Sequence, residues 1–243
     1  MTFAAIHSES RIPWHAPFAQ KMQMGMNKVG IQTVITNSRE RVSCDFAVLL
    51  GTSLWADIEA DGRFLLVDRC SFGDTNEWVS LVWDGHGRRG NHRVPQDLGN
   101  RWERIGVRVE PWRSGGDKIV LAGQTAPYSG HWATLHDWYA THPEATHFRP
   151  HPAQSVLNGM LNLPTWRTFD DVARLITLNS SVAVAAILDG VPTTCDDMGA
   201  MAYPGFDAGS DRLPWLQWLA WTQWHHDEVS NGESIRHIFD SVQ

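Results

Sequence analysis

The sequence has few cysteines and no long apolar stretch, and each absence excludes a class of protein. Its three cysteines, Cys44, Cys70 and Cys195, show no CxxC spacing, so we expect reduced thiols rather than a disulfide scaffold or a structural zinc site. No stretch approaches the roughly 20 apolar residues of a membrane span, and the first residues lack the positively charged lead of a signal peptide. These absences favour a cytoplasmic protein that has no membrane partner.

Composition and length argue against disorder. Hydrophobic residues make up 42% of the chain and charged residues 19%, which is ordinary for a globular protein. The 243 residues fit one large domain or two small ones, and they show no internal repeat. Twelve histidines are present, but His147 and His151 lie on either side of Pro150 and cannot share a helical face. We therefore expect a folded protein without a metal site.

Positive charge is sparse overall but concentrated in one segment. The formal net charge of −7 argues against indiscriminate binding to nucleic acid. Between residues 88 and 113, however, seven arginines stand against three acidic residues, inside a glycine-rich stretch that shows little helical periodicity. The first three, Arg88, Arg89 and Arg93, lie in a loop whose glycines leave it free to adapt to phosphates. This segment is either a nucleic-acid contact or a solvated basic loop.

The first half of the chain alternates between apolar runs and amphipathic segments. This alternation predicts a parallel sheet that is covered by helices. The expected strands are residues 3–7, 32–36, 46–50 and 64–67, with a helix over 15–29 and a short one over 53–59. The irregular stretch 70–111 follows.

The second half repeats this pattern from about residue 117. Strands are expected at 118–122, 145–149, 176–178 and 191–194, and helices at 131–141, 168–175 and 181–188, with closing helices at 214–229 and 233–239. Ser180 and Ser181 precede the helix over 181–188, and Gly190 and Pro192 end it. A serine cap at a helix start is either a phosphate site or the ordinary cap of a core helix.

Three polar loops follow strands of this second half. Gln124 follows the first strand, Arg149 and His151 lie in a proline-locked turn after the second, and the two serines follow the third. Ligands of open parallel sheets bind beyond the carboxyl ends of the strands. The sequence therefore predicts a phosphate site formed by Gln124, Arg149, His151, Ser180 and Ser181.

The order of these short motifs resembles a known family. Gly-Gln at 123–124, Arg-Pro-His-Pro at 149–152, Thr-Trp-Arg-Thr-Phe-Asp-Asp at 165–171, Asn-Ser-Ser at 179–181 and Asp-Gly-Val-Pro-Thr at 189–193 occur in that order. They resemble the nucleotide-sugar half of GT-B-type glycosyltransferases, especially the capsule-polysaccharide and sialyl- or Kdo-transferase-like group. The resemblance implies two Rossmann-like halves with a cleft between them, and a nucleotide-sugar as co-substrate, with no other cofactor.

The resemblance extends to both ends of the chain. Residues 18–30, 45–51 and 65–69 are similar to the acceptor half of small, often phage-encoded glycosyltransferases, and residues 218–232 are similar to that group's closing helix. It implies an acceptor-side domain over 1–113 and a donor domain over 114–243. It also implies a double-stranded DNA acceptor that carries hydroxymethylated bases, contacted by the arginine-rich loop. A saccharide or lipid-linked acceptor, or a non-catalytic nucleotide- or carbohydrate-binding module, remain alternatives.

Transfer of a sugar requires a general base for the acceptor hydroxyl. Asp68 is the first candidate because it ends a strand, and His7 and Asp84 are the next. Asp68 is equally compatible with a structural ion pair. The dipeptide Asp68-Arg69 stands where the group often carries Glu-Arg. No DxD motif of the metal-dependent kind is present, and Asp196-Asp197 is too generic to indicate a metal.

Overall fold

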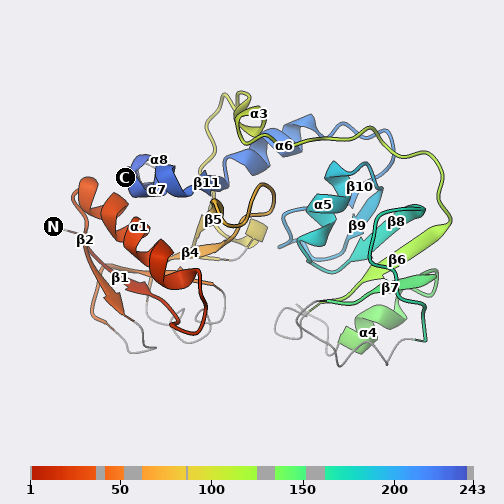
Figure 1. Ribbon diagram of the computed structural model, residues 1–243, viewed down its shortest axis with the longest axis horizontal. Helices are drawn as coiled ribbons and strands as arrows, with labels where there is room; N and C mark the ends of the chain where they lie inside the picture. The colour runs from red at the N-terminus through yellow and green to blue at the C-terminus, as the bar shows by residue number, and fades with distance from the viewer. Residues whose placement is uncertain are drawn as a thin grey trace. The chain divides into compact units, whose positions relative to one another are not determined.

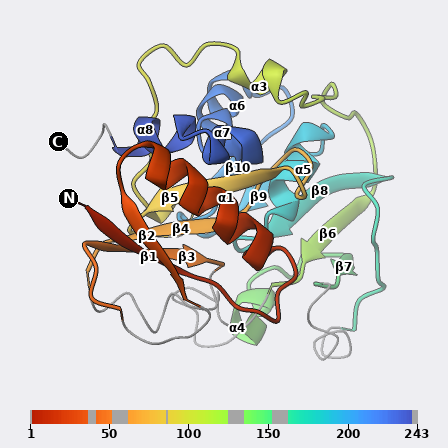
Figure 2. The ribbon, with the colours of Figure 1, turned by 60° about the vertical axis from the view of Figure 1, so that its left-hand side comes forward.

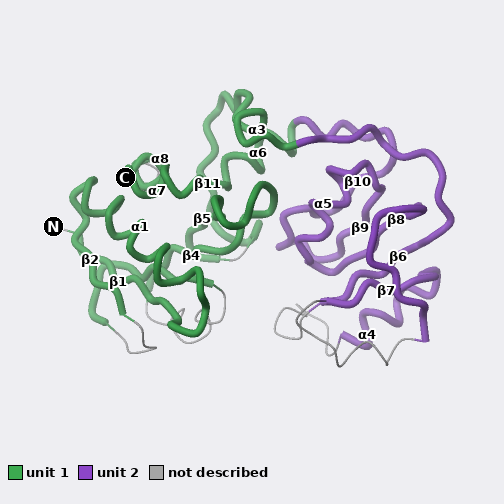
Figure 3. The backbone as a smooth tube through the Cα atoms, in the orientation of Figure 1, with its two compact units in different colours: residues 1–107, 214–243 green, residues 108–213 purple. Residues whose placement is uncertain are grey.

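The chain folds into two compact units (Figures 1 and 3). The computed structural model describes residues 2–36, 42–51, 62–85, 87–124, 135–151 and 162–239. Unit 1 consists of residues 1–107 together with 214–243, and unit 2 consists of residues 108–213. The sequence placed 114–243 in one domain, whereas the structure returns the last 30 residues to the first unit. The expected fold class, two α/β units with mostly parallel sheets, is confirmed.

Unit 1 contains a six-stranded sheet in the order β11-β5-β4-β3-β1-β2. Its parallel part consists of β1 (Phe3–His7), β2 (Gln32–Thr36), β3 (Phe46–Leu50) and β4 (Phe64–Arg69). Next, β5 (Trp78–Trp83) runs antiparallel to β4, and β11 (Gln223–His225) runs antiparallel to β5. Thus β5 lies in the stretch that the sequence marked as irregular, because its apolar run has neither strict alternation nor a helical period.

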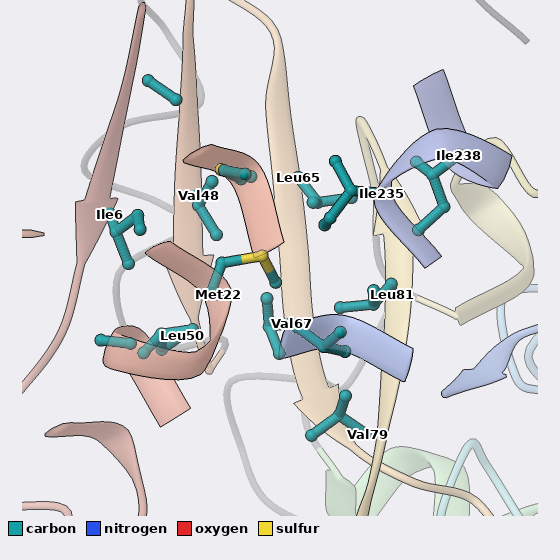
Figure 4. Packing of buried hydrophobic residues seen from close by; sticks show 14 of the residues in the cluster. Ile6, Met22, Val48, Leu50, Leu65, Val67, Val79, Leu81, Ile235 and Ile238 are labelled. Carbon is teal, nitrogen blue, oxygen red and sulfur yellow. The ribbon is translucent and has the colours of Figure 1, made fainter. Parts of the chain in front are cut away.

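Three helices cover one face of this sheet (Figure 2). They are α1 (His15–Lys28), α7 (His226–Ser230) and α8 (Glu233–Phe239). Side chains from these helices pack on alternate residues of the strands, including Met22 on Leu50 and Val67 (Figure 4). A Cβ atom on Gly25 of α1 would lie 1.8 Å from the carbonyl oxygen of Val229, so only glycine permits this close crossing of α1 and α7.

A buried ion pair also ties the closing segment to unit 1. Arg101 of α3 (Arg101–Arg104) donates to both carboxylate oxygens of Glu228, at 2.7 and 2.6 Å, and to the carbonyls of Ala220 and Gln223. The expected long helix over 214–229 is wrong. The chain forms α6 (Leu213–Ala220), then turns into β11 before α7 begins. Residues 223–225 pair with β5, and this tertiary contact overrides the local helix propensity of the segment.

Unit 2 contains a five-stranded sheet in the order β10-β9-β8-β6-β7. Four strands are parallel, and the short β10 (Gly205–Phe206) pairs antiparallel with β9. The parallel strands are β6 (Lys118–Ala122), β7 (His147–Arg149), β8 (Val172–Thr177) and β9 (Thr193–Cys195). The helix expected over 168–175 is wrong, since residues 172–177 form β8 and bury four of their six side chains.

The two faces of this sheet carry separate apolar clusters. Leu121 and Phe148 pack against α4 (Leu135–Ala140), which covers one face. Val120 and Leu175 pack with Ala186 of α5 (Val182–Leu188), which covers the other. The polar loops of interest therefore follow strands that are fixed on both faces.

Candidate functional site

The carboxyl edge of the unit 2 sheet carries all five residues predicted to bind a phosphate. Gln124 lies two residues beyond β6, Arg149 ends β7 with His151 just after it, and Ser180 and Ser181 follow β8. Because β6, β7 and β8 are parallel neighbours, these loops leave the sheet at the same edge. The structure thus brings the predicted residues to one edge.

Gly123 allows two of these loops to approach closely. Its N–H donates to the Arg149 carbonyl at 2.7 Å, and a Cβ atom at this position would lie 2.8 Å from the backbone nitrogen of His151. A side chain at residue 123 would therefore force the turn outward. The close approach places Gln124, which is 6% exposed, near the turn that carries His151. Burial lowers the pKa of His151, so this imidazole is neutral at pH 7.

Arg149 is already held by protein groups. Its guanidinium donates to the Arg167 carbonyl and lies 5.6 Å from the centre of the Phe169 ring. Burial, together with the nearby Arg167 charge, lowers the pKa of Arg149. An arginine has five N–H donors in a fixed fork, so the contact with Arg167 orients the group and leaves other donors for a ligand.

The two serines occupy the start of α5 in a different way from a conventional cap. Ser181 is the N-cap residue, but its side chain caps no backbone group. The Val182 N–H donates instead to the Ser180 Oγ at 3.4 Å, and the Ser180 N–H donates to the Thr177 Oγ1 at 3.2 Å. With seven residues, α5 has a weak dipole, so the hydroxyls and the Arg149 donors would have to supply most of the interaction with an anion.

Two acidic residues whose pattern in the sequence is generic, Asp196 and Asp197, also belong to this edge. Asp196 follows β9 and accepts hydrogen bonds from Trp138 Nε1 and His142 Nε2, both at 2.8 Å. Burial alone would raise the pKa of Asp196, but the two hydrogen bonds outweigh it and lower the pKa. The bond to Asp196 raises the pKa of His142. The signal in the sequence was an acidic pair directly after a buried strand.

Asp197 fixes the serine loop, which is Asn179–Ser181, to the loop after β9. Its carboxylate accepts from Asn179 Nδ2 and from the Gly199 N–H, both at 2.8 Å, and the residue is 3% exposed. The Asp197 N–H donates to the Leu178 carbonyl at 2.9 Å. The Asn179–Ser181 loop is therefore held on a buried carboxylate.

In unit 1 the structure brings together two of the three predicted catalytic residues. His7 ends β1 and is 2% exposed, and Asp68 lies near the end of β4. His7 pairs with Leu49 and Leu49 pairs with Leu66, so the two-residue period of a strand puts His7 and Asp68 on the same face. Both lie at the carboxyl edge, with β3 between their strands.

Asp84 lies at the opposite edge of the same sheet. Because β5 runs antiparallel to β4, its end lies beside the start of β4, where the Asp84 N–H donates to the Phe64 carbonyl at 2.9 Å. The carboxylate forms an ion pair with Arg63 at 3.1 Å and accepts from the Phe64 N–H. Asp84 therefore cannot share a site with His7 and Asp68, and its grouping with them is corrected.

A fully buried histidine lies at the carboxyl edge of unit 1 and was missed. His15 begins α1, is 0% exposed, and accepts a hydrogen bond at Nδ1 from the Glu9 N–H at 3.0 Å. Burial lowers the pKa of His15, against smaller opposing effects of the Glu9 and Asp68 carboxylates. Its Nε2 has no hydrogen-bond partner in the part of the chain that the structure describes. A histidine at a helix start has no distinctive sequence pattern.

The arginine-rich loop is more constrained than the sequence suggested. A Cβ atom on Gly85 would lie 2.8 Å from Gly90, and Trp83 bridges to Asn91, so the loop is closed by its own backbone. Arg88 stacks on the ring of Trp218 at 4.7 Å, and Arg93 donates to the His237 carbonyl at 3.3 Å. The expectation that this loop is free to adapt is therefore wrong, although Arg88, Arg89 and Arg93 are exposed.

Three of the other four arginines of this segment have an acidic partner. Arg101 pairs with Glu228, Arg108 with Glu110 and Arg113 with Asp189, whereas the fourth, Arg104, is exposed. Glu228 and Asp189 lie outside the segment, so they offset two of its four excess positive charges, which are seven arginines less three acidic residues.

The described residues contain neither a membrane-spanning helix nor a cluster of metal ligands. No helix among them is both long and apolar enough to span a lipid bilayer. No three histidine, cysteine or acidic side chains among them converge as metal ligands would.

Comparison with known proteins gives similarity in structure only. No protein-family model matches the sequence, and no curated protein matches it significantly. The chain is similar to the Thermosulfurimonas dismutans KpsC beta Kdo 2,7 transferase, at 12% identity and a TM-score of 0.48 over 97% of this chain and 99% of that one. It is also similar to the beta Kdo 2,4 transferase of the same KpsC, at 10% identity and a TM-score of 0.46 over 90% and 89%. At these values the likeness says nothing about the substrate of this chain.

Proposed function

We propose that this protein is a glycosyltransferase that moves a sugar from a nucleotide-sugar donor to a hydroxyl group of a saccharide acceptor. The observation that carries the proposal is the meeting of Gln124, Arg149, His151, Ser180 and Ser181 at one carboxyl edge of a parallel sheet. Such edges bind nucleotides in many α/β proteins. The order of the motifs that hold these residues, which resembles the donor half of GT-B-type enzymes, supports the same function.

The proposed reaction needs groups that stabilise the departing phosphate. The acceptor oxygen forms a bond to the anomeric carbon, the bond from that carbon to the nucleotide phosphate breaks, and its electron pair stays on the phosphate oxygen. Preorganised donors lower the energy of that charge. Arg149 supplies a positive charge, and the serine hydroxyls supply hydrogen bonds from a loop fixed by Asp197.

The acceptor hydroxyl must also lose its proton to a base. Asp68 and His7 share one face at the carboxyl edge of unit 1, and either can accept that proton. We favour a saccharide over DNA as the acceptor, because the protein carries a net charge of −7 and acidic partners from outside the arginine-rich segment offset two of its four excess positive charges. DNA binding depends strongly on unneutralised basic groups.

The donor site can be tested by ligand-induced thermal stabilisation. UDP-, GDP-, ADP- and CMP-sugars are screened, since a ligand at 100 times its Kd adds about 2.7 kcal/mol of stability. With the donor found, Arg149→Ala should weaken binding about 10- to 100-fold, as expected for loss of hydrogen bonds to a charged group. Arg174→Ala is the matched control, because Arg174 is an exposed arginine of β8 that pairs with Asp207. Equal weakening in both variants would contradict the proposed donor site.

Turnover separates a transferase from a non-catalytic binding module. Donor is incubated with a panel of saccharides and with hydroxymethylated DNA, and release of nucleotide is measured. Asp68→Asn and His7→Gln should bind donor like the unmodified protein, and loss of the base should lower kcat in at least one of them by about 100-fold or more. Donor binding without turnover on any acceptor would favour the module. Turnover on DNA alone would overturn the saccharide acceptor.

A further inference from the structure

A cavity opens at the amino edge of the unit 1 sheet, under helix α8. Its volume is about 430 Å³, which lies within the range of cavities that bind small molecules. Phe46 begins β3, Arg63 directly precedes β4 and Trp83 ends the antiparallel β5, so all three lie at this edge. Helix α8 contributes Ile235 and Phe239. The residues that line the cavity all belong to unit 1.

This cavity is separate from the candidate catalytic residues. His7 and Asp68 lie at the carboxyl edge, which is the other end of the same parallel strands. Strand β3 begins at Phe46 in the cavity and ends at Leu50, so four rises of about 3.3 Å put the two edges about 13 Å apart. A ligand in this cavity therefore does not occupy the position of the acceptor hydroxyl.

The apolar part of the lining contains three aromatic rings. Phe46 and Trp83 are buried, and Phe239 packs against both. The ring centres lie 5.3 Å apart for Phe46 and Trp83, 5.1 Å for Phe46 and Phe239, and 5.0 Å for Trp83 and Phe239. The planes of each pair are steeply inclined, which is the arrangement that aromatic pairs prefer. The cavity thus offers a preformed apolar surface that suits another aromatic ring.

The polar part of the lining carries a net positive charge. It consists of the exposed residues Thr2, Asp45, Arg63 and Arg236. Two guanidinium groups and one carboxylate leave an excess of one positive charge. The Asp45 carboxylate already accepts a hydrogen bond from the Phe3 N–H at 2.8 Å. The charge of the lining therefore favours an anionic ligand over a cationic one.

Arg63 is held in place by its own contacts. Its Nε and Nη2 donate to Asp84 Oδ2 at 3.2 and 3.1 Å, and its Cζ lies 4.7 Å from the centre of the Trp83 ring. These bonds use two of the five N–H donors of the guanidinium and fix its plane. A carboxylate can bind the remaining donors without displacing Asp84, and paired donors of this kind match the two oxygens of a carboxylate.

We propose that this cavity binds an aromatic carboxylate. The ring of the ligand packs against Phe46, Trp83 and Phe239, and its carboxylate accepts hydrogen bonds from Arg63 and Arg236 at the rim. An apolar cavity with a few convergent polar groups orients a ligand in this way in many proteins. The site is additional to the proposed transfer reaction and does not depend on it.

Ligand-observed nuclear magnetic resonance titrations of the full chain test the class of ligand. The main probe is 2-naphthoate, and 2-naphthylmethanol and 2-naphthylmethylamine are its neutral and cationic analogues. 2-Naphthoate should bind at least tenfold more tightly than either analogue, because only its carboxylate accepts from the guanidinium groups. Benzoate and cyclohexanecarboxylate form a second pair, in which benzoate should bind more tightly.

Substitution of the two arginines tests the location of the site. Arg63→Gln and Arg236→Gln should each weaken 2-naphthoate binding about tenfold, as expected for loss of hydrogen bonds from a charged group. Arg69→Gln is the matched control, because Arg69 is an exposed arginine at the other end of β4. Arg149→Ala tests whether the probe binds the predicted phosphate site of unit 2 instead, and it should bind 2-naphthoate like the unmodified protein.

Thermal unfolding shows whether each variant is folded before its binding is compared. Arg63→Gln also loses the ion pair with Asp84, so it is the variant at greater risk. Arg236 is exposed on α8, and Arg236→Gln therefore decides the location if Arg63→Gln does not fold. These measurements need no turnover, so their outcome is independent of whether the protein is a transferase.

Each outcome supports or overturns the inference. Weaker 2-naphthoate binding in Arg236→Gln, with unchanged binding in Arg69→Gln and Arg149→Ala, supports it. Equal weakening in Arg236→Gln and Arg69→Gln, or weakening in Arg149→Ala alone, places the probe elsewhere and overturns it. Equal or tighter binding of the alcohol or the amine overturns the choice of an anion, and equal binding of cyclohexanecarboxylate and benzoate overturns the choice of an aromatic ring. Absence of binding by both aromatic carboxylates also overturns it.

Discussion

The carboxyl edges of the two sheets differ in how their buried polar groups are satisfied. In unit 2, Asp196 accepts from Trp138 and His142, and Asp197 accepts from Asn179 and Gly199. In unit 1, His15 is buried and uses only one of its two ring nitrogens among the described residues. Both edges follow parallel strands, so the difference comes from the loops and not from the sheets.

This difference indicates which kind of ligand each edge can bind. A network of buried hydrogen bonds holds a loop in one conformation before a ligand arrives. The serine loop of unit 2 has that property, which suits a charged phosphate that needs fixed donors. A buried donor without a partner gains free energy when a ligand supplies one. Among the described residues at the edge of unit 1, Nε2 of His15 is such a donor.

The largest expected effect comes from removing the carboxylate that holds the serine loop. Asp197→Ala should lower the free energy of unfolding by about 3 kcal/mol, because Asn179 and the Gly199 N–H lose a charged acceptor. Urea unfolding checks the stability, and donor titration checks whether the loop still binds. Asp197→Asn, which keeps one acceptor oxygen, is the control and should lose less. Donor affinity that survives Asp197→Ala would show that the serines do not depend on this network.

The next effect tests the close approach of two loops. Gly123→Ala should cost about 1–3 kcal/mol, because its Cβ would meet backbone atoms that cannot yield like a flexible side chain. The forced shift of the turn at Arg149 and His151 should also weaken donor binding. Thermal unfolding with and without the nucleotide-sugar measures both effects. Unchanged donor stabilisation in this variant would argue that the turn does not contact the donor.

The sequence predicted the four parallel strands of unit 1 and β6 of unit 2, and the reason is physical. Apolar runs such as Phe46–Leu50 are buried on both faces of a parallel sheet, so their composition alone marks them. The sequence could place the candidate site residues of unit 2 at one edge because the carboxyl edge of a sheet is set by strand direction. The prediction failed at β5, which lay in the stretch expected to be irregular. Because β5 runs antiparallel to β4, it carries Asp84 to the opposite edge.

Contacts between distant segments were beyond the reach of sequence patterns. The pairing of β11 with β5 and the crossing at Gly25 return the last residues to unit 1, and both depend on partners more than 100 residues away. His15 was missed likewise, because nothing in the sequence shows that its side chain is fully buried. Asp196 had a visible signal, but its role depends on His142 and Trp138 from another segment.

A smaller effect concerns the pH dependence of the unit 2 edge. Asp196 raises the pKa of His142 above the usual 6.5, so the charged pair stabilises the fold fully below pH 6.5 and loses this contribution as pH rises through the raised pKa. The pKa of Asp196 is lowered, so its contribution is lost only when pH falls through that value. Relative to His142→Gln, the protein should lose about 1 kcal/mol of stability between pH 6 and 9. Parallel pH profiles of the two unfolding midpoints would contradict this.

The smallest effect completes the comparison at the unit 1 edge. His15→Asn should change the free energy of unfolding by only about 1 kcal/mol, mostly through lost packing, because Nε2 has no described partner to lose and Glu9 keeps an acceptor. Urea unfolding of this variant beside Asp197→Ala measures the contrast directly. If His15→Asn costs as much as Asp197→Ala, then Nε2 is already satisfied within the protein. The buried polar groups of the two edges would then be equally well hydrogen-bonded, and the difference between the edges would not exist.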